Sequence, residues 1–363
     1  MNTYAEISLS AIKHNIVEVR KLLAAGTRFM AVVKANAYGH GVVAVSRAAV
    51  EAGAESLAVA NLKEALEIRE AGVVCPILIL TESPTSVMDE IVQYDLRQTV
   101  YSFSEARTLS EEARKRQKTA RVHVKVDTGM GRVGVPPSEA VAFVTKIASL
   151  PGIEVEGIFT HFAMAEDPND NYTAQQFQKF KQIISRIRNA PVRHAANSAA
   201  VLYHPDTHLD MVRVGLMIYG LYPVGTSRRL VSLKPALSFK SRVTYLKRIP
   251  VGTPLSYGCT YTAASDSTVA TIPVGYADGF NRRLSNRGQV IIRGKRYPVV
   301  GRVTMDLTLV NVGDDRVEVG DEVMLIGEQN GQAISVDEVA GLEDTISYEV
   351  ICGIGKRVPR IYT

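Results

Sequence analysis

A lysine at the end of an apolar run is the side chain of this sequence best suited to covalent chemistry. Residues 29–33 are apolar, and Lys34 follows them, ahead of an asparagine, a tyrosine and two glycines that favour a tight loop. An amine at the end of a buried strand is poorly solvated, which lowers its pKa and makes the neutral nucleophile accessible. Such lysines form Schiff bases. Taken alone, the pattern fits a strand that ends in a solvated charge equally well.

Other polar side chains stand at the ends of further apolar runs. They are Lys34 and Tyr38, then Lys125, Asp127 and Arg132, then His161, then His194, Asn197 and Ser198, and finally Arg213 and Gly215. If these runs are parallel strands of one closed sheet, their carboxyl ends converge on a single mouth, where active sites of such barrels lie. Five strand ends that all carry reactive side chains indicate an active site.

Eight short β-branched runs position these side chains, and segments with helical periodicity separate most of them. The runs are 29–33, 56–60, 76–80, 97–101, 122–126, 155–160, 192–195 and 209–214. Residues 61–72 are typical of the separating segments, with an asparagine cap, an apolar face and a final glycine. This order predicts an α/β fold, a (β/α)8 TIM-type barrel. A doubly wound sheet is the alternative, but Gly39-His-Gly41 is too short for its phosphate fingerprint.

The character of the sequence changes after Ser227, where prolines and turn signals divide it into short extended runs. We expect strands at 241–246, 267–272, 289–293 and 322–326. The sequence therefore predicts a barrel domain over residues 9–228. A mainly β C-terminal domain over residues 229–363, joined by a strand within residues 1–8, should follow it.

Composition and charge narrow the classes of function. The chain has 363 residues, of which 46% are hydrophobic and 22% charged, enough for a sizeable core. Its net charge of +5 is spread along the sequence, so nucleic-acid binding is not expected. The three widely spaced cysteines form neither a disulfide framework nor a zinc motif, which favours the cytoplasm. We see no signal peptide and no membrane-spanning run, and expect no membrane association.

The last two strand ends are suited to bind a phosphate. Backbone amides and helix N-termini point at an anion after the seventh and eighth strands of such barrels, where Asn197-Ser198 and Gly215-Leu216 stand. Ordinary helix capping would explain Ser198 alone. A phosphate site, a reactive lysine and a partner for a ring nitrogen are what pyridoxal 5′-phosphate requires. Arg213 is the candidate ring partner, and a permanently protonated arginine would leave the ring nitrogen largely unprotonated.

The sequence resembles the alanine racemases over essentially its whole length. Residues 32–41, Val-Val-Lys-Ala-Asn-Ala-Tyr-Gly-His-Gly, match that family's cofactor-lysine signature throughout. Further matches are Lys-Val-Asp-Thr-Gly-Met-Gly-Arg at 125–132, Phe-Thr-His-Phe-Ala at 159–163, Met-Val-Arg-Val-Gly at 211–215, Ser-Tyr-Gly at 256–258, Val-Gly-Tyr-Ala-Asp-Gly at 274–279, Thr-Met-Asp at 304–306 and Ile-Ser-Tyr-Glu-Val at 346–350. One departure is Thr304, where many relatives have cysteine.

The resemblance implies an isomerase that interconverts L- and D-alanine with pyridoxal 5′-phosphate and two bases. Lys34 would hold the cofactor and exchange the α-proton on the D face, and Tyr257 of a second subunit would do so on the L face. His161 and Arg213 would form a relay that tunes Tyr257 and the cofactor ring. The resemblance further implies a cytoplasmic homodimer with shared active sites, which supplies D-alanine for peptidoglycan.

The resemblance also assigns binding roles to residues of both domains. Arg132 and the partner's main chain at Met305 would hold the substrate carboxylate, and Tyr276 with Tyr348 would narrow the entrance to favour a methyl side chain. His194 and Asn197 would support the ring and the relay. The phosphate would be bound by Tyr38, Ser198, Gly215, Leu216 and Tyr348.

Lys125 has two interpretations. Some relatives carry a carbamylated lysine there, whose negative charge pairs with the equivalent of Arg132, and the resemblance favours this modification. The alternative is a salt bridge from Lys125 to Asp127 or another acid.

Other functions stay open at the level of sequence. A racemase of broader specificity, acting on serine for example, would use the same scaffold. A decarboxylase of this fold type usually has an acid at the ring nitrogen, which Arg213 argues against. A non-enzymatic cofactor carrier consists of the barrel alone, without the domain that carries Tyr257 and Met305. Taken singly, His161, Tyr257 and Tyr348 would be explained by packing.

Overall fold

A computed structural model describes residues 2–187, 191–223 and 230–363 of the protein. These residues form two compact units. One contains Ser10–Ala37 and Val42–Lys234, and the other contains the segment ending at Leu9, Tyr38–Gly41 and Pro235–Thr363. The domain boundary expected at residues 228 and 229 lies outside the described residues.

The first unit is a closed barrel of eight parallel strands, which confirms the predicted TIM-type fold. Each predicted run overlaps one barrel strand, although β2, β6 and β7 begin one or two residues before the predicted runs. The strands are β2 (Arg28–Val32), β3 (Ser56–Val59), β4 (Ile77–Ile79), β5 (Arg97–Val100), β6 (Ala120–Lys125), β7 (Ile153–Phe159), β8 (Val192–His194) and β9 (Met211–Val214). The barrel closes where β9 pairs with β2 in the register Ala31↔Val214.

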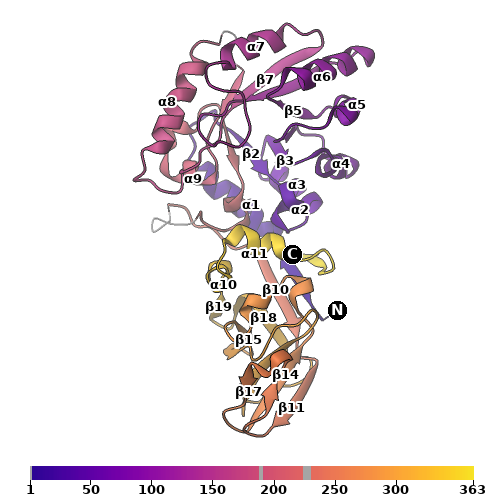
Figure 1. The fold of residues 1–363 in the computed structure, drawn as a ribbon, viewed down its shortest axis with the longest axis vertical. Coiled ribbons are helices and arrows are strands. Elements are labelled where there is room, and N and C mark those ends of the chain that lie inside the picture. The colour runs from indigo at the N-terminus through magenta and orange to yellow at the C-terminus, as the bar shows by residue number, and fades with distance from the viewer. Residues whose placement is uncertain (1, 188–190, 224–229) are drawn as a thin grey trace. The chain divides into compact units, whose positions relative to one another are not determined.

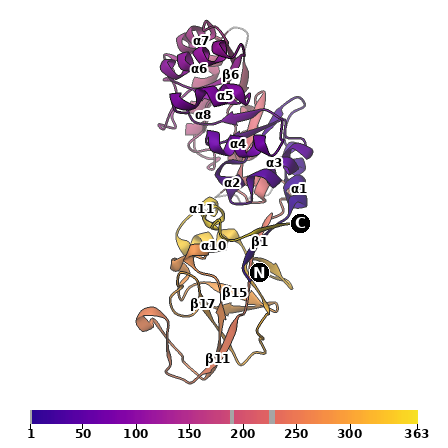
Figure 2. The ribbon, with the colours of Figure 1, turned by 90° about the vertical axis from the view of Figure 1, so that its right-hand side faces the viewer.

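Helices surround this barrel, as Figures 1 and 2 show from two sides. Some of them begin at a side-chain cap, such as Asn61, which accepts from the Glu64 amide, and Ser102, which accepts from the Glu105 amide. The helices are α1 (Leu9–Arg20), α3 (Val42–Glu51), α4 (Leu62–Glu70), α5 (Met88–Gln93), α6 (Phe103–Lys115), α7 (Ala140–Ala148), α8 (Tyr172–Ile184) and α9 (Ser198–Tyr203), with 3-10 turns η1 (Thr85–Val87), η2 (Pro205–Thr207) and η3 (Leu216–Tyr219).

The second unit is mainly β, with two helices, α10 (Val336–Glu343) and α11 (Ser347–Gly353). Both views place these helices at one end of the unit and β11 at the other (Figures 1 and 2). Its largest sheet has the order β16 (Lys295–Pro298), β15 (Gln289–Ile292), β18 (Glu322–Gln329), β10 (Leu237–Arg242), β1 (Tyr4–Ile7) and β20 (Arg360–Tyr362), with β19 (Gln332–Ile334) against β18. A second sheet has the order β11 (Tyr245–Ile249), β14 (Ser267–Ile272) and β17 (Thr308–Gly313), and β12 (Pro254–Leu255) pairs with β13 (Tyr261–Thr262).

The single strand predicted at 241–246 is wrong. The chain leaves the large sheet after Arg242 and enters the three-stranded sheet at Tyr245. At the bend, Val243 pairs through its backbone with Asp321 and Gly320, so its hydrogen bonds leave both ladders. A run that looks like one strand in the sequence therefore contains a change of sheet.

Candidate active site

Lys34 stands at the carboxyl end of the barrel, in a turn with left-handed backbone. The four residues after it, 35–38, have φ between 51° and 54°, although none of them is glycine. Left-handed backbone costs about 1–2 kcal/mol per residue with a side chain. Such strain persists only where surrounding contacts fix it, and it clusters at functional sites.

Two side chains fix this turn through its backbone amides. Asn36 Oδ1 accepts from the Val42 amide at 2.8 Å. Glu64, in the first turn of α4, accepts from the amides of Ala35 and Ala60 at 2.7 and 2.8 Å. The position of Lys34 is therefore determined by hydrogen bonds to its own loop and to the neighbouring βα unit.

Arg213, near the carboxyl end of β9, is a buried cation held by hydrogen bonds to neutral groups. Its Nη1 donates to His194 Nδ1 at 3.0 Å, and its Nη2 donates to His161 Nδ1 at 3.2 Å. Nη2 also donates to the carbonyls of Thr160 and Ala195, at 2.7 and 2.9 Å. Burial lowers the pKa of Arg213 to about 9, so the guanidinium is still protonated at neutral pH.

Both histidines beside Arg213 are neutral. Burial, followed by the charge of Arg213, holds the pKa values of His161 and His194 well below the ordinary range. A guanidinium has no acceptor atom, so both Nδ1 atoms accept and both rings carry their proton on Nε2. His161 therefore carries its proton on Nε2, the ring nitrogen that does not bond to Arg213.

Lys125 is buried at the end of β6, close to other cations. Burial and the positive charges of Arg132 and Arg213 lower its pKa to about 8. The charge of Asp127 acts in the opposite direction and raises this pKa, and the Asp127 carboxylate accepts from the amides of Gly129 and Gly131, at 3.0 and 3.1 Å. Across the described ranges of the chain, no ion pair joins Lys125 to an acid, which argues against the salt-bridge alternative.

The two segments expected to bind phosphate are joined directly. Ser198, the first residue of α9, accepts from the Gly215 amide at 3.0 Å, and Leu216 follows at the start of η3. Asn197 caps α9 by accepting from the Ala200 amide at 2.9 Å. The Asn197 side chain therefore bonds to its own helix.

The second unit holds Tyr257, Tyr276 and Met305 on adjoining loops. The side chains are 73%, 43% and 53% exposed, respectively. Backbone bonds tie the loops together, since the Tyr276 and Ala277 amides donate to the Thr304 and Met305 carbonyls at 3.0 and 3.1 Å. The loop of Tyr257 joins them through the Ser256 hydroxyl, which donates to the Arg302 carbonyl at 2.7 Å, so the three exposed side chains belong to one edge of the unit.

Tyr38 and Tyr348 also belong to the second unit. Their ring centroids lie 6.0 Å apart, and burial raises the pKa of Tyr38 above the ordinary range. The backbone at Gly39 lies close to the backbone of α11, because a Cβ on Gly39 would lie 2.3 Å from the carbonyl oxygen of Ile351. The close approach of residues 38–41 to α11 thus requires glycine at position 39.

Comparison with known families decides where the chain belongs. A family model described as alanine racemase, N-terminal domain, matches residues 7–223, and one described as alanine racemase, C-terminal domain, matches residues 236–362. The chain belongs to the alanine racemase family. An alanine racemase of Halothermothrix orenii is 47% identical over 99% of this chain and 96% of its own length.

Solved alanine racemases have the same fold. One from Clostridium difficile, at 37% identity, covers 100% of this chain and 96% of its own, with a TM-score of 0.96. Another, from Bartonella henselae, has 30% identity, full coverage of both chains and a TM-score of 0.91, and it is described with covalently bound pyridoxal phosphate.

The departure from the alanine racemase pattern at Thr304 has a local structural role. Thr304 Oγ1 donates to the Leu307 carbonyl at 2.9 Å and accepts from the Leu307 amide at 3.1 Å. The hydroxyl closes the turn that carries Met305. The main chain at Met305 is therefore held in place without a cysteine.

Sequence reasoning missed one cluster inside the barrel. His123 of β6 bonds to His194 at 2.8 Å and to Glu156 of β7 at 3.1 Å, and Glu156 pairs with Arg97 of β5. The available signal was a histidine between two valines in the middle of a predicted strand, Arg-Val-His-Val-Lys.

Within residues 2–187, 191–223 and 230–363, no helix is both long and apolar enough to cross a membrane. The same part of the chain contains no group of three side chains arranged to ligate a metal ion.

Proposed function

We propose that this protein interconverts L- and D-alanine with pyridoxal 5′-phosphate, using Lys34 and Tyr257 of the partner subunit as its two bases. The observation that carries the proposal is the buried Arg213 cation at the mouth of the barrel, bonded to two neutral histidines in a chain that belongs to the alanine racemase family throughout.

The residues at the barrel mouth fit the cofactor. Lys34 would hold its aldehyde carbon, Arg213 would donate to the ring nitrogen, and the joined Ser198 and Gly215 segments, with Leu216, would bind its phosphate. Tyr38 and Tyr348 of the second unit would also contact the phosphate, and His194 and Asn197 would support the ring. The bound cofactor supplies an electron sink that makes the α-hydrogen of alanine acidic.

Arg213 sets how strongly that sink acts. As a permanent donor with no acceptor atom, it can hydrogen-bond to an unprotonated ring nitrogen but does not protonate it. We propose that this weakens delocalisation of negative charge into the ring and so limits side reactions such as transamination.

Two bases on opposite faces explain inversion. One base removes the α-proton and the other delivers a proton to the opposite face. Lys34 would remove the α-proton from D-alanine, and Tyr257 would remove it from L-alanine. A free phenol titrates near ~10 and needs help to lose its proton. The Nε2–H of His161 would give that help by donating to the phenolate oxygen of Tyr257.

The exposed edge of the second unit supports the homodimer. Tyr257, Tyr276 and Met305 present apolar surface to solvent in the single chain, and Leu307 and Ile346 are also exposed. We propose that a second copy covers this edge. There the partner's main chain at Met305 would join Arg132 on the substrate carboxylate, and Tyr276 and Tyr348 would narrow the entrance.

Lys125 meets the physical conditions for carbamylation. With a pKa near 8 its amine is partly neutral, and the neutral amine can add to carbon dioxide, forming a C–N bond and releasing one proton. The resulting carboxylate would pair with Arg132. Carbon-13 NMR of protein incubated with labelled bicarbonate should show a carbamate signal that Lys125→Ala removes, and an unchanged signal in that variant would contradict the assignment.

Racemisation assays on a panel of L-amino acids, read by chiral chromatography, test the reaction. Alanine should be turned over much faster than any other amino acid, and comparable rates on serine would favour the broader-specificity alternative. Borohydride reduction of the holoenzyme should fix the cofactor on Lys34, and a label on another lysine would contradict the site. Supply of D-alanine for peptidoglycan and a cytoplasmic location remain predictions from the family.

A further inference from the structure

A continuous line of hydrogen bonds crosses the barrel interior from Arg213 to Glu156. Arg213 Nη1 bonds to His194 Nδ1 at 3.0 Å, His194 Nε2 to His123 Nδ1 at 2.8 Å, and His123 Nε2 to Glu156 Oε2 at 3.1 Å. The four side chains come from the adjacent strands β9, β8, β6 and β7. The line therefore runs along one side of the barrel, from the active-site mouth towards the amino ends of the strands.

The chemistry of its two ends gives the line a single direction. Arg213 has only donors, so His194 accepts at Nδ1 and must donate from Nε2. His123 then accepts at Nδ1 and donates from Nε2 to Glu156, whose ionised carboxylate has only acceptors. Both imidazoles are thus fixed as the Nε2–H tautomer, with every donor pointing from Arg213 towards Glu156.

The line also connects the buried Arg213 cation to a carboxylate. Within the described part of the chain no carboxylate pairs directly with Arg213, and Glu156 is the carboxylate that bonds to the line. Most other charged groups near the line are cations: Arg97 and Arg121 at Glu156, Arg28 near His194, and Lys34, Lys125 and Arg132 around His161. The remaining carboxylates lie at the far end, where Asp95 pairs with Arg97 and Arg121, Glu154 pairs with Arg121, and Glu55 lines the same cavity. Glu156 therefore supplies negative charge to a strongly positive interior.

Packing holds the two imidazoles in place. The His194 ring stacks on Phe159 with centroids 4.7 Å apart, and the His123 ring meets His194 edge-on at 5.0 Å. A Cβ on Gly157 would lie 2.3 Å from His123 Nδ1, so this residue must be glycine for the ring to reach His194. The geometry leaves the rings little freedom to exchange tautomers by turning over.

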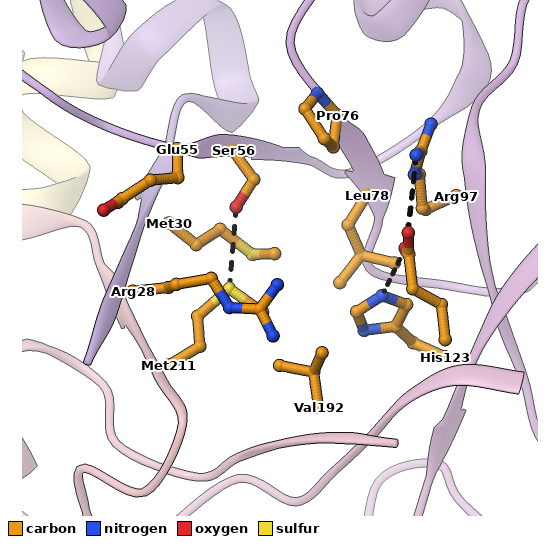
Figure 3. Close-up of a pocket in the computed structure, with 11 residues that line it drawn as sticks. Arg28, Met30, Glu55, Ser56, Pro76, Leu78, Arg97, His123, Val192 and Met211 are labelled. Carbon is orange, nitrogen blue, oxygen red and sulfur yellow. Dashed lines mark hydrogen bonds and ion pairs between the residues drawn. The ribbon is translucent and has the colours of Figure 1, made fainter. Parts of the chain in front are cut away.

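The far end of the line reaches a small cavity at the amino end of the barrel. His123, Glu156 and Arg97 line this cavity of about 70 Å³, together with Arg28 and the first residues of several strands. Figure 3 shows Arg97 and His123 on one side of it and Arg28, Met211 and Val192 on the other. The carboxylate end is thus placed on the side of the barrel away from Lys34.

We propose that Glu156 and His123 are positioning residues that act on Arg213 through His194, by fixing the tautomers along the line and by supplying the counter-charge that the buried guanidinium lacks. The structural part concerns this chain alone. Only its kinetic consequence rests on the proposed racemase function.

Nitrogen-15 NMR of the cofactor-free protein tests the structural part. Long-range spectra should assign the Nε2–H tautomer to His123 and His194, with both rings neutral at pH 7. Glu156→Gln should move the shifts of both rings, whereas Glu154→Gln, an exposed neighbour on the same strand, should not. An Nδ1–H tautomer at His194, or equal shifts in the two variants, would overturn the proposal whatever the activity.

The pH profile of kcat/KM in the holoenzyme tests the kinetic part. Removing a negative charge lowers the pKa of nearby groups, so Glu156→Gln should move the alkaline limb to lower pH by roughly 0.5 unit or more. Glu154→Gln should leave the limb in place. A lower rate with an unmoved profile would mean a purely structural role and would overturn the proposal. Absence of racemisation in the unmodified protein would instead refute the proposed function and leave the NMR result standing.

Discussion

At the scale of single residues, Arg213 differs from other arginines of the chain in how its charge is balanced. Arg193, on the neighbouring strand, pairs directly with Asp210 at 2.7 Å, and Arg97 pairs with Asp95 and Glu156. Arg213 instead donates to two imidazoles and two carbonyls. Its geometry therefore depends on the planar fork of a guanidinium, which presents several donors in fixed directions.

Arg213→Lys should lower racemisation strongly. A lysine ammonium cannot reach both histidines in the fork geometry, and each lost bond to a charged group is worth about 1.5–3 kcal/mol. We expect kcat/KM to fall by roughly 100-fold, measured with alanine in both directions. Arg193→Lys is the matched control and should stay near the unmodified rate. Equal losses in the two variants would refute the role of the fork.

Glu156 should make folding stability depend on pH in the acid range. Burial opposes its ionisation, but the His123 hydrogen bond and the charge of Arg97 lower its pKa to about 2, against an ordinary value of 4.5. The ionised form therefore stabilises the fold above pH 4.5, and this contribution is lost as the pH falls towards 2. Urea unfolding should show the largest cost of Glu156→Gln at neutral pH and a smaller cost at pH 3. A cost independent of pH would contradict the assignment.

At the scale of elements, the strands were predictable and several connections were not. Eight short apolar runs separated by helical segments predict a closed barrel. The same runs predict the strand ends that carry Lys34, Lys125, His161 and Arg213. The bend at Val243 lies inside a run that looks like a single strand, and its cause is pairing with Asp321, which is distant in sequence. The contact of His123 with His194 was also not predictable. The alternation of side chains along a strand indicates which face of the sheet a residue lies on, but it does not indicate which residue it contacts there.

Gly39 should tolerate alanine much less well than another glycine with similar backbone. Gly39 and Gly26 have φ of 82° and 89°, but a Cβ on Gly39 would lie 2.3 Å from the Ile351 carbonyl, while nothing lies within 4 Å at Gly26. Gly26→Ala should cost about 1–2 kcal/mol from backbone conformation alone. Gly39→Ala should cost clearly more in thermal or urea unfolding. Equal costs would mean that the contact with α11 is easily relaxed.

The cap of α9 should influence cofactor binding as well as stability. Asn197→Ala removes the acceptor for the Ala200 amide and should cost about 1 kcal/mol of stability. Because the cap fixes Ser198, the affinity for pyridoxal 5′-phosphate should fall too, measured by titrating the cofactor-free protein. Ser335→Ala, which removes the cap of α10 in the second unit, should cost similar stability and leave affinity unchanged. A shared loss of affinity would contradict this.

At the scale of the whole molecule, the side chains for which we propose functions belong to both units. The barrel carries Lys34, Arg132, His161 and Arg213, whereas Tyr257 and Met305 stand exposed on the second unit. The sequence predicted this division through family motifs, because no local pattern marks an exposed tyrosine in a β unit as a base. A site completed by a second copy would explain why these side chains are left uncovered in one chain.

Subunit complementation tests this central claim most directly. Lys34→Ala and Tyr257→Phe each remove one base, so neither homodimer should racemise alanine. In a mixed dimer one site loses both bases, but the other combines an intact Lys34 with an intact Tyr257 of the opposite subunit. After unfolding and refolding an equal mixture, we predict about a quarter of the unmodified activity. Mixed dimers that form, as shown by differently tagged subunits, yet recover no activity would contradict the shared two-base site.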